Sequence, residues 1–120
     1  MVKIAVDYIY PEELDFLEHG FWLSEENDPD EGHFSYVRLY DDGKSKLIVT
    51  HSPFSNISFS AKLISDGITV FNIHQEYVTE IQFQEWNNEE VIRVYCNLKE
   101  IDSEFRVYYS PKPRVVVSNT

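Results

Sequence analysis

The feature that most constrains the fold of this sequence is a repeated alternation of apolar and polar residues. It is clearest at VIRVYCNL, where Ile92, Val94, Cys96 and Leu98 occupy every second position. Successive side chains of a β-strand point to opposite faces, so a period of two predicts a strand with one buried face. We therefore expect these four side chains to lie in a hydrophobic core.

The same alternation returns in short segments along the whole chain. In FSAKLIS and EFRVYYS it predicts inward faces, formed by the residues Phe59, Ala61, Leu63, Phe105, Val107 and Tyr109. In YVTEIQFQEW it places Tyr77, Ile81 and Phe83 opposite Glu80, Gln82 and Gln84. The other predicted strands are VKIAVDYIY, FSYVRLY, SKLIVTH, ITVFNIH and RVVVS, and FWLS is either a short strand or a packed connector.

Turn signals separate these segments. DDGK (41–44), DG (66–67), NNEE (87–90) and DSE (102–104) are rich in Asp, Asn and Gly, which favour tight hairpin turns. About eight or nine short strands with such turns predict a mainly β fold, either an antiparallel β-sandwich or an open barrel.

One short helix is predicted near the N-terminus, in PEELDFLEHG. Pro11 suits the first helical position and Gly20 suits a left-handed cap, while Leu14 and Leu17 share one face. The length of 120 residues predicts a single domain, residues 1–120. No apolar run approaches a membrane span, no secretory leader is evident, and one cysteine cannot form an internal disulfide, so we expect a cytoplasmic protein.

The charge of the chain is strongly asymmetric. The net charge is −11, and residues 1–43 carry twelve acidic and two basic residues. EENDPDEG (25–32) alone holds five carboxylates and is predicted to be a loop. Such a field repels nucleic acid and attracts basic partners, so we expect a protein partner, no direct nucleic-acid binding and no membrane association.

No pattern of catalytic or cofactor-binding residues accompanies this charge. An EF-hand loop starting at Asp28 or Glu26 would place Leu39 or Val37 at the position that needs a bidentate Glu, although an irregular cation site stays an alternative. The four histidines lack metal-ligand spacing, and Cys96 alternates with core residues. We therefore predict no enzyme activity, no cofactor and no metal site.

The predicted partner-binding residues surround the acidic loop. On FSYVRLY, the aromatic face of Phe34, Tyr36 and Tyr40 is either core, which strand statistics favour, or a surface patch edged by acids. Trp22 immediately precedes the loop and is of a type common in binding hot spots. The predicted contact residues are Trp22, Glu25, Glu26, Asp28, Asp30, Glu31, Tyr36 and Tyr40.

The segments FSAKLISDGITVFNI, VTEIQFQEWNNEEVIRVY and FRVYYS, within residues 58–118, carry a resemblance to a known family. In their spacing they resemble the small all-β immunity proteins of bacterial polymorphic-toxin and contact-dependent growth inhibition systems. The resemblance implies a cytosolic antidote that binds one cognate toxin and blocks its active site, with no active-site residues of its own. Together with the charge, it predicts an inhibitor of a cationic toxin, with a nuclease as the natural target.

Other functions are compatible with the same sequence. An acidic phage-type inhibitor that mimics DNA against a nuclease or CRISPR effector would use the same electrostatics. A small-ligand-binding β-barrel or enzyme would need a concave pocket with convergent polar groups. A structural subunit would need a large apolar interface.

Overall fold

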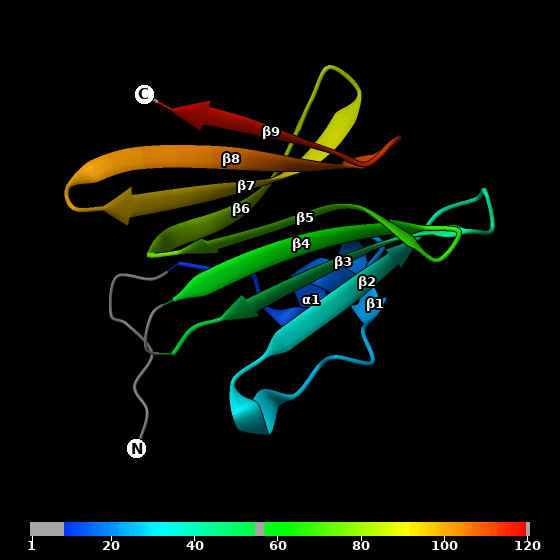
Figure 1. Ribbon diagram of the computed structural model, residues 1–120, viewed down its shortest axis with the longest axis horizontal. Helices are drawn as coiled ribbons and strands as arrows, with labels where there is room; N and C mark the ends of the chain where they lie inside the picture. Colours follow the sequence, from blue (N-terminus) through cyan, green and yellow to red (C-terminus); the bar gives the residue numbers. More distant parts are fainter. Residues whose placement is uncertain (1–8, 55–56, 120) are drawn as a thin grey trace.

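The computed structural model describes residues 9–54 and 57–119, which form two antiparallel sheets packed face to face (Figure 1). This confirms the predicted sandwich, and the sheets do not close into a barrel. The five-stranded sheet consists of β1 (Trp22–Leu23), β2 (Phe34–Leu39), β3 (Ser45–Ser52), β4 (Ser58–Ser65) and β5 (Ile68–Glu76), in that order. The four-stranded sheet consists of β6 (Val78–Trp86), β7 (Glu89–Leu98), β8 (Ile101–Ser110) and β9 (Arg114–Asn119).

A single residue, Tyr77, carries the chain from one sheet to the other. It lies between β5 and β6 with φ +61°. Its carbonyl oxygen accepts a hydrogen bond from the amide of Asn97 at 3.0 Å, and the amide of Val78 donates to the carbonyl of Ile57 at 3.1 Å. Each sheet is consequently built from consecutive strands of one stretch of the chain.

The hairpin turns explain most of the strand boundaries. Both residues of the 66–67 turn and both of the 87–88 turn have positive φ, as the Asp-Gly and Asn-Asn signals predict. The turn predicted at 102–104 is wrong, because those residues belong to β8 and the chain reverses at Lys99 and Glu100, which also have positive φ. Neither Lys nor Glu is a turn signal, so strand pairing on either side imposes this conformation.

The core contains residues from the inner faces of both sheets, and the predicted inward residues of β4 and β8 are all buried. In β7 the prediction holds for Ile92, Val94 and Cys96 but not for Leu98, which is 44% exposed. The last pair between β6 and β7 is Val78 with Cys96, so Leu98 extends past its neighbouring strand.

The predicted inward position of Tyr77 is also wrong, because its side chain is exposed. The register between β6 and β7 shifts between Val78 and Glu80, which leaves Thr79 as an extra residue. The bulge reverses the alternation at the start of β6, so that Val78 takes the core position.

The short helix α1 (Glu13–Glu18) closes one side of the sandwich. Glu12 is its N-cap, so Pro11 precedes the helix instead of occupying its first position. Phe16 is the buried residue of the helix; its ring stacks on that of Tyr36 at 4.0 Å and meets the ring of Phe83 edge-on at 5.0 Å. Phe16 thus bridges β2 of one sheet and β6 of the other.

Most of the predicted first strand, VKIAVDYIY, lies outside the described residues. Within the described part, Ile9 forms a parallel bridge with Glu80, and the amide of Ile81 donates to the carbonyl of Ile9 at 2.9 Å. No helix in residues 9–54 and 57–119 has the length and hydropathy needed to cross a membrane.

Candidate protein-binding surface

The acidic segment between β1 and β2 is a closely hydrogen-bonded turn. Asp28 and His33 exchange backbone hydrogen bonds of 2.8 and 2.9 Å on either side of η1 (Pro29–Glu31), a 3₁₀ turn. The amide of Ser35 donates to Oδ1 of Asn27 at 3.0 Å, which ties the segment to β2. This bonding fixes the backbone that carries the acidic side chains.

Close packing also fixes the end of this turn. Gly32 has φ +77°, a left-handed conformation that L residues rarely adopt. A β-carbon at this position would lie 2.5 Å from the ring of Phe54. The hydroxyl of Ser52 donates to the carbonyl of Gly32 at 2.8 Å. The segment is therefore anchored to β3 as well as to β2.

All five predicted loop carboxylates are exposed: Glu25, Glu26, Asp28, Asp30 and Glu31. Glu26 lies 3.5 Å from the ammonium group of Lys62 on β4. The other four form no ion pair with any residue in the described ranges 9–54 and 57–119. Their charge is therefore available to an external cation.

Trp22 lies beside this loop on the edge strand β1 and is 66% exposed. It is paired with Val37 on β2, which fixes its backbone in the sheet. An exposed tryptophan on a rigid strand presents a large apolar area with few degrees of freedom to lose on binding. The structure thus places Trp22 and the acidic loop consecutively on one edge of the sandwich.

The predicted aromatic contacts Tyr36, on β2, and Tyr40, which directly follows β2, face the interior. Tyr36 is 2% exposed and belongs to the core, so its assignment to a surface patch is wrong. Tyr40 is half-buried, and its hydroxyl donates to the carbonyl of Tyr109 at 2.8 Å. Burial raises the pKa of both Tyr36 and Tyr40 to about 12. The interpretation of this face as core is confirmed.

A cavity that no sequence pattern predicts lies between α1 and the acidic loop. Its volume is about 230 Å³, and it is lined by residues 10–13, Asn27, Pro29, Phe34, Tyr36 and His51. Phe16 of α1 stacks on Tyr36 of β2, and residues 10–13 line the cavity together with Asn27 and Pro29 of the loop. No local pattern signals such a contact.

His51 and Tyr36 form the buried floor of this cavity. The imidazole of His51 lies among aromatic rings, with ring centroids 5.1 Å from Tyr10 and 5.4 Å from Phe34. Burial lowers its pKa to about 4, so the ring is neutral near pH 7. The rim carries the exposed side chains of Glu12 and Glu13.

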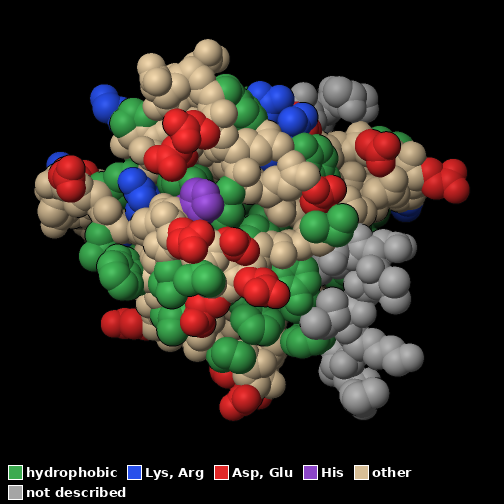
Figure 2. Space-filling model, turned by 180° about the vertical axis from the view of Figure 1, so that it is seen from behind, with side chains coloured by type: hydrophobic (Ala, Val, Ile, Leu, Met, Phe, Trp, Pro, Cys, Tyr) green, Lys and Arg blue, Asp and Glu red, His purple; other side chains and the backbone are tan. Residues whose placement is uncertain are grey.

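The acidic residues of the first third of the chain do not form one continuous patch. Figure 2 shows Asp and Glu side chains set among apolar ones across the face on which α1 lies. Asp41 and Asp42, however, follow β2 at its far end from the loop, and the carboxylate of Asp42 accepts backbone hydrogen bonds from Lys44 and Ser45. Glu12 and Glu13 line the cavity, and the loop acids Asp28 and Asp30 adjoin its lining residues Asn27 and Pro29 in the sequence, whereas the turn at Asp41 and Asp42 is separate.

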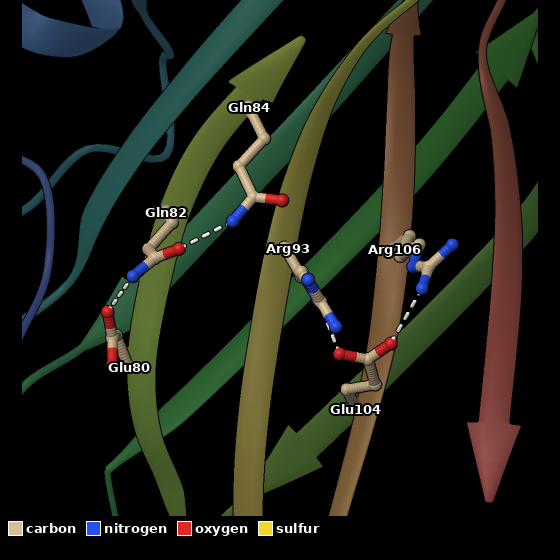
Figure 3. A network of polar contacts seen from close by, with 6 residues as sticks. All are labelled: Glu80, Gln82, Gln84, Arg93, Glu104 and Arg106. Carbon is tan, nitrogen blue, oxygen red and sulfur yellow. Dashed lines mark hydrogen bonds and ion pairs between the residues drawn. The ribbon is translucent and has the colours of Figure 1, made fainter. Parts of the chain in front are cut away.

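The outer face of the four-stranded sheet is internally neutralised. Figure 3 shows the carboxylate of Glu104 between the guanidinium groups of Arg93 and Arg106, and an amide chain running from Gln84 through Gln82 to Glu80. Aromatic rings cover three guanidinium groups, in the pairs Arg93–Tyr95, Arg106–Trp86 and Arg114–Tyr108. The cations of this face already have partners within the chain.

Two features of the described residues concern metal binding and the reactivity of the single cysteine. Residues 9–54 and 57–119 contain no group of three or more His, Cys, Asp or Glu side chains placed to hold a metal ion. Cys96 is buried, and burial raises the pKa of its thiol to about 11, which disfavours the nucleophilic thiolate.

No family model matches this chain, and no curated protein matches it in sequence. Its structure is similar to a chain in the solved "Contact-dependent growth inhibition toxin - immunity protein complex from Klebsiella pneumoniae 342". The TM-score is 0.80 at 13% sequence identity, and the match covers 95% of this chain and 98% of the other. The resemblance to proteins of contact-dependent growth inhibition systems is therefore confirmed at the level of the fold.

Proposed function

We propose that this chain is an immunity protein that binds and neutralises a cognate cationic toxin of a contact-dependent growth inhibition system. The observation that carries the proposal is the similarity of nearly the whole fold to a chain of a toxin–immunity complex. The proposed contact surface consists of Trp22 and the loop carboxylates Glu25, Glu26, Asp28, Asp30 and Glu31. We further propose that the toxin is a nuclease and that the complex forms in the cytoplasm.

The charge of the chain supports the inhibitor role over the toxin role. A nuclease must attract a polyanion, usually with a groove lined by Lys and Arg. This chain has a net charge of −11, and the arginines on the outer face of its second sheet are paired internally. Four unpaired loop carboxylates fit the surface of a basic partner better than they fit a nucleic acid.

The two parts of the proposed surface have different physical roles. Exposed carboxylates accelerate association with a cationic protein and favour the correct orientation, and this effect weakens as salt is added. An exposed tryptophan contributes affinity when it becomes buried at the centre of an interface. Loss of the carboxylates should therefore slow association, whereas loss of Trp22 should accelerate dissociation.

A pull-down with this chain identifies its bound protein, and co-expression of the two proteins then tests this proposal. The wild-type chain should restore growth of cells that express the toxin. If expression of this chain alone inhibited growth, the chain would be a toxin and not an immunity protein. A chain that gives no protection against its bound partner would exclude the immunity role.

A charge-matched pair of variants tests the surface. Neutralising the loop with Glu25→Gln, Asp28→Asn, Asp30→Asn and Glu31→Gln should reduce the association rate constant about tenfold or more at low salt. The control Asp66→Asn, Glu76→Gln, Glu85→Gln and Glu100→Gln makes the same change in net charge at four exposed acids outside the loop. Equal effects of the two variants would show that net charge matters and that the loop does not.

A further inference from the structure

We propose that the cavity between α1 and the acidic loop accepts a lysine or arginine side chain of the protein partner. This inference rests on the proposed function and adds an anchor point to it. It assigns a role to α1 and to Glu12 and Glu13, which are not part of the contact surface proposed above. The cavity adjoins that surface because Asn27 and Pro29 of the acidic segment form one of its walls.

The size and the walls of the cavity suit one long cationic side chain. Its volume of about 230 Å³ corresponds to roughly seven or eight water molecules. The half-buried Tyr10 and Phe34 and the almost fully buried Tyr36 and His51 line it. One face of the Tyr36 ring already stacks on Phe16, so Tyr10 and Phe34 supply most of the accessible aromatic surface. The faces of such rings attract a cation within about 6 Å, most strongly where water is excluded. The aliphatic part of a lysine or arginine would pack against the same rings.

The rim of the cavity supplies negative charge. Glu12 and Glu13 are exposed, and neither forms an ion pair with any residue that the structure describes. The charge of Glu13 acts on the floor of the cavity, since it is one of the causes, after burial, that raise the pKa of the Tyr36 hydroxyl. No Lys or Arg lines the cavity, so its own lining contains no cation that would compete.

The outward surface of α1 points to a protein as the source of the cation. Leu14 is 63% exposed and Leu17 is also exposed, whereas Phe16 alone of the helix is buried. A short helix that directs two leucines to solvent beside a charged cavity provides the apolar surroundings that protein interfaces place around a buried anchor. A free small cation would need no such surroundings.

Titration of the full-length chain with single-residue probes tests the cavity. The probes are N-acetyl-arginine amide, N-acetyl-lysine amide and, as the neutral control, N-acetyl-norleucine amide. Binding is followed by NMR through the aromatic ¹H–¹³C signals of the protein. A cationic probe should give saturable shifts at Phe34, Tyr36 and His51 that the neutral probe does not give. Absence of saturable shifts with both cationic probes would overturn the proposal.

Two double variants make the test specific. Glu12→Gln/Glu13→Gln should weaken binding of the cationic probe at least fivefold, whereas Glu25→Gln/Glu31→Gln, which removes the same charge outside the cavity, should leave it within twofold. All four side chains are exposed, and a Gln at position 12 can still accept the capping hydrogen bond from the backbone of Asp15, so both variants should fold, as circular dichroism will check. If both variants lost the same affinity for the cationic probe, Glu12 and Glu13 would have no specific role. The loss would then reflect only the change in net charge.

The same variants separate this inference from the proposed function. If a toxin side chain occupies the cavity, Glu12→Gln/Glu13→Gln should lower the affinity for the toxin at least tenfold and Leu14→Ser should lower it further. Unchanged toxin affinity would overturn the inference even if the probe binds, while the immunity role would stand on the protection given by the wild-type chain. Failure of the immunity role would instead appear as absence of protection by the wild-type chain.

Discussion

Replacement of His51 by phenylalanine should remove a defined part of the pH dependence of stability. His51 is 2% exposed, and burial lowers its pKa to about 4 in the folded chain, against 6.5 for the unperturbed group. Because the folded value is the lower one, the neutral imidazole is the form that the fold accommodates. Below pH 6.5 the unfolded chain takes up a proton at this position that the folded chain does not.

The magnitude follows from the two pKa values. The stabilisation associated with neutral His51 is complete above about pH 6.5 and is lost as the pH falls towards 4. Between pH 7.5 and 5.0 this single group should lower the free energy of unfolding by about 2 kcal/mol, and the full loss below pH 4 is about 3 kcal/mol. Carboxylates also titrate in acid, but they are common to the wild type and the variant.

Urea unfolding at pH 7.5, 6.0 and 5.0, followed by tryptophan fluorescence, measures the effect. Relative to His51→Phe, the free energy of unfolding of the wild type should fall by about 2 kcal/mol from pH 7.5 to pH 5.0. If His51→Phe does not fold, His51→Asn removes the same titration. A constant difference across this range would refute the reasoning, because it would mean that His51 titrates normally in the folded chain.

Three further predictions concern the packing of the molecule. Gly32→Ala should lower the free energy of unfolding by about 1–2 kcal/mol, because the residue has a left-handed conformation and a β-carbon would strike Phe54; an unchanged urea midpoint would contradict this. Cys96 should react with a thiol reagent at pH 8 at least about 100-fold more slowly in the native chain than in guanidinium, and equal rates would contradict its burial. Tyr109→Phe should leave stability unchanged or raise it by up to about 1 kcal/mol, because its buried hydroxyl has no hydrogen-bond partner among the residues described; a marked loss on urea unfolding would show that it has one.

The strands were predictable because the signals that define them are local. Alternation identified the buried faces of β4 and β8, and Asp-Gly and Asn-Asn identified two of the hairpin turns. These features depend on a few neighbouring residues, so a single sequence is sufficient to find them. The similarity of the folds, despite 13% identity with the solved chain, agrees with a fold set by such patterns.

The departures arise where pairing between strands overrides a local preference. The extra residue at Thr79 reverses the alternation and exchanges Tyr77 for Val78 in the core. Lys99 and Glu100 adopt positive φ because the hairpin brings Leu98 opposite Ile101. Neither the bulge nor the turn at Lys99 and Glu100 changes the local amino-acid composition or the alternation of apolar and polar residues in a recognisable way. The sequence alone therefore could not locate them.

The candidate site likewise has some features that the sequence predicts and others that it does not. The exposure of the acidic loop was predictable, because a segment without an apolar period has no face to bury. The orientation of Tyr36 was a choice between two faces, and only the packing of Phe16 against it shows which one is inside. The cavity beside α1 depends on contacts between distant segments, which the order of residues does not reveal.

The crossing at Tyr77 affects how the molecule holds together. Within each sheet every strand pairs with its neighbour in sequence, so backbone hydrogen bonds tie each sheet mainly to itself. Among the described residues, the bridge between Ile9 and Glu80 joins the segment before α1 to the second sheet, and the amide of Val78 donates to the carbonyl of Ile57, just before β4 of the first. Cohesion between the two layers therefore comes mainly from apolar contacts such as that of Phe59 with Phe105. Separation of the two sheets would break mainly these apolar contacts and would leave the strand pairing within each sheet intact.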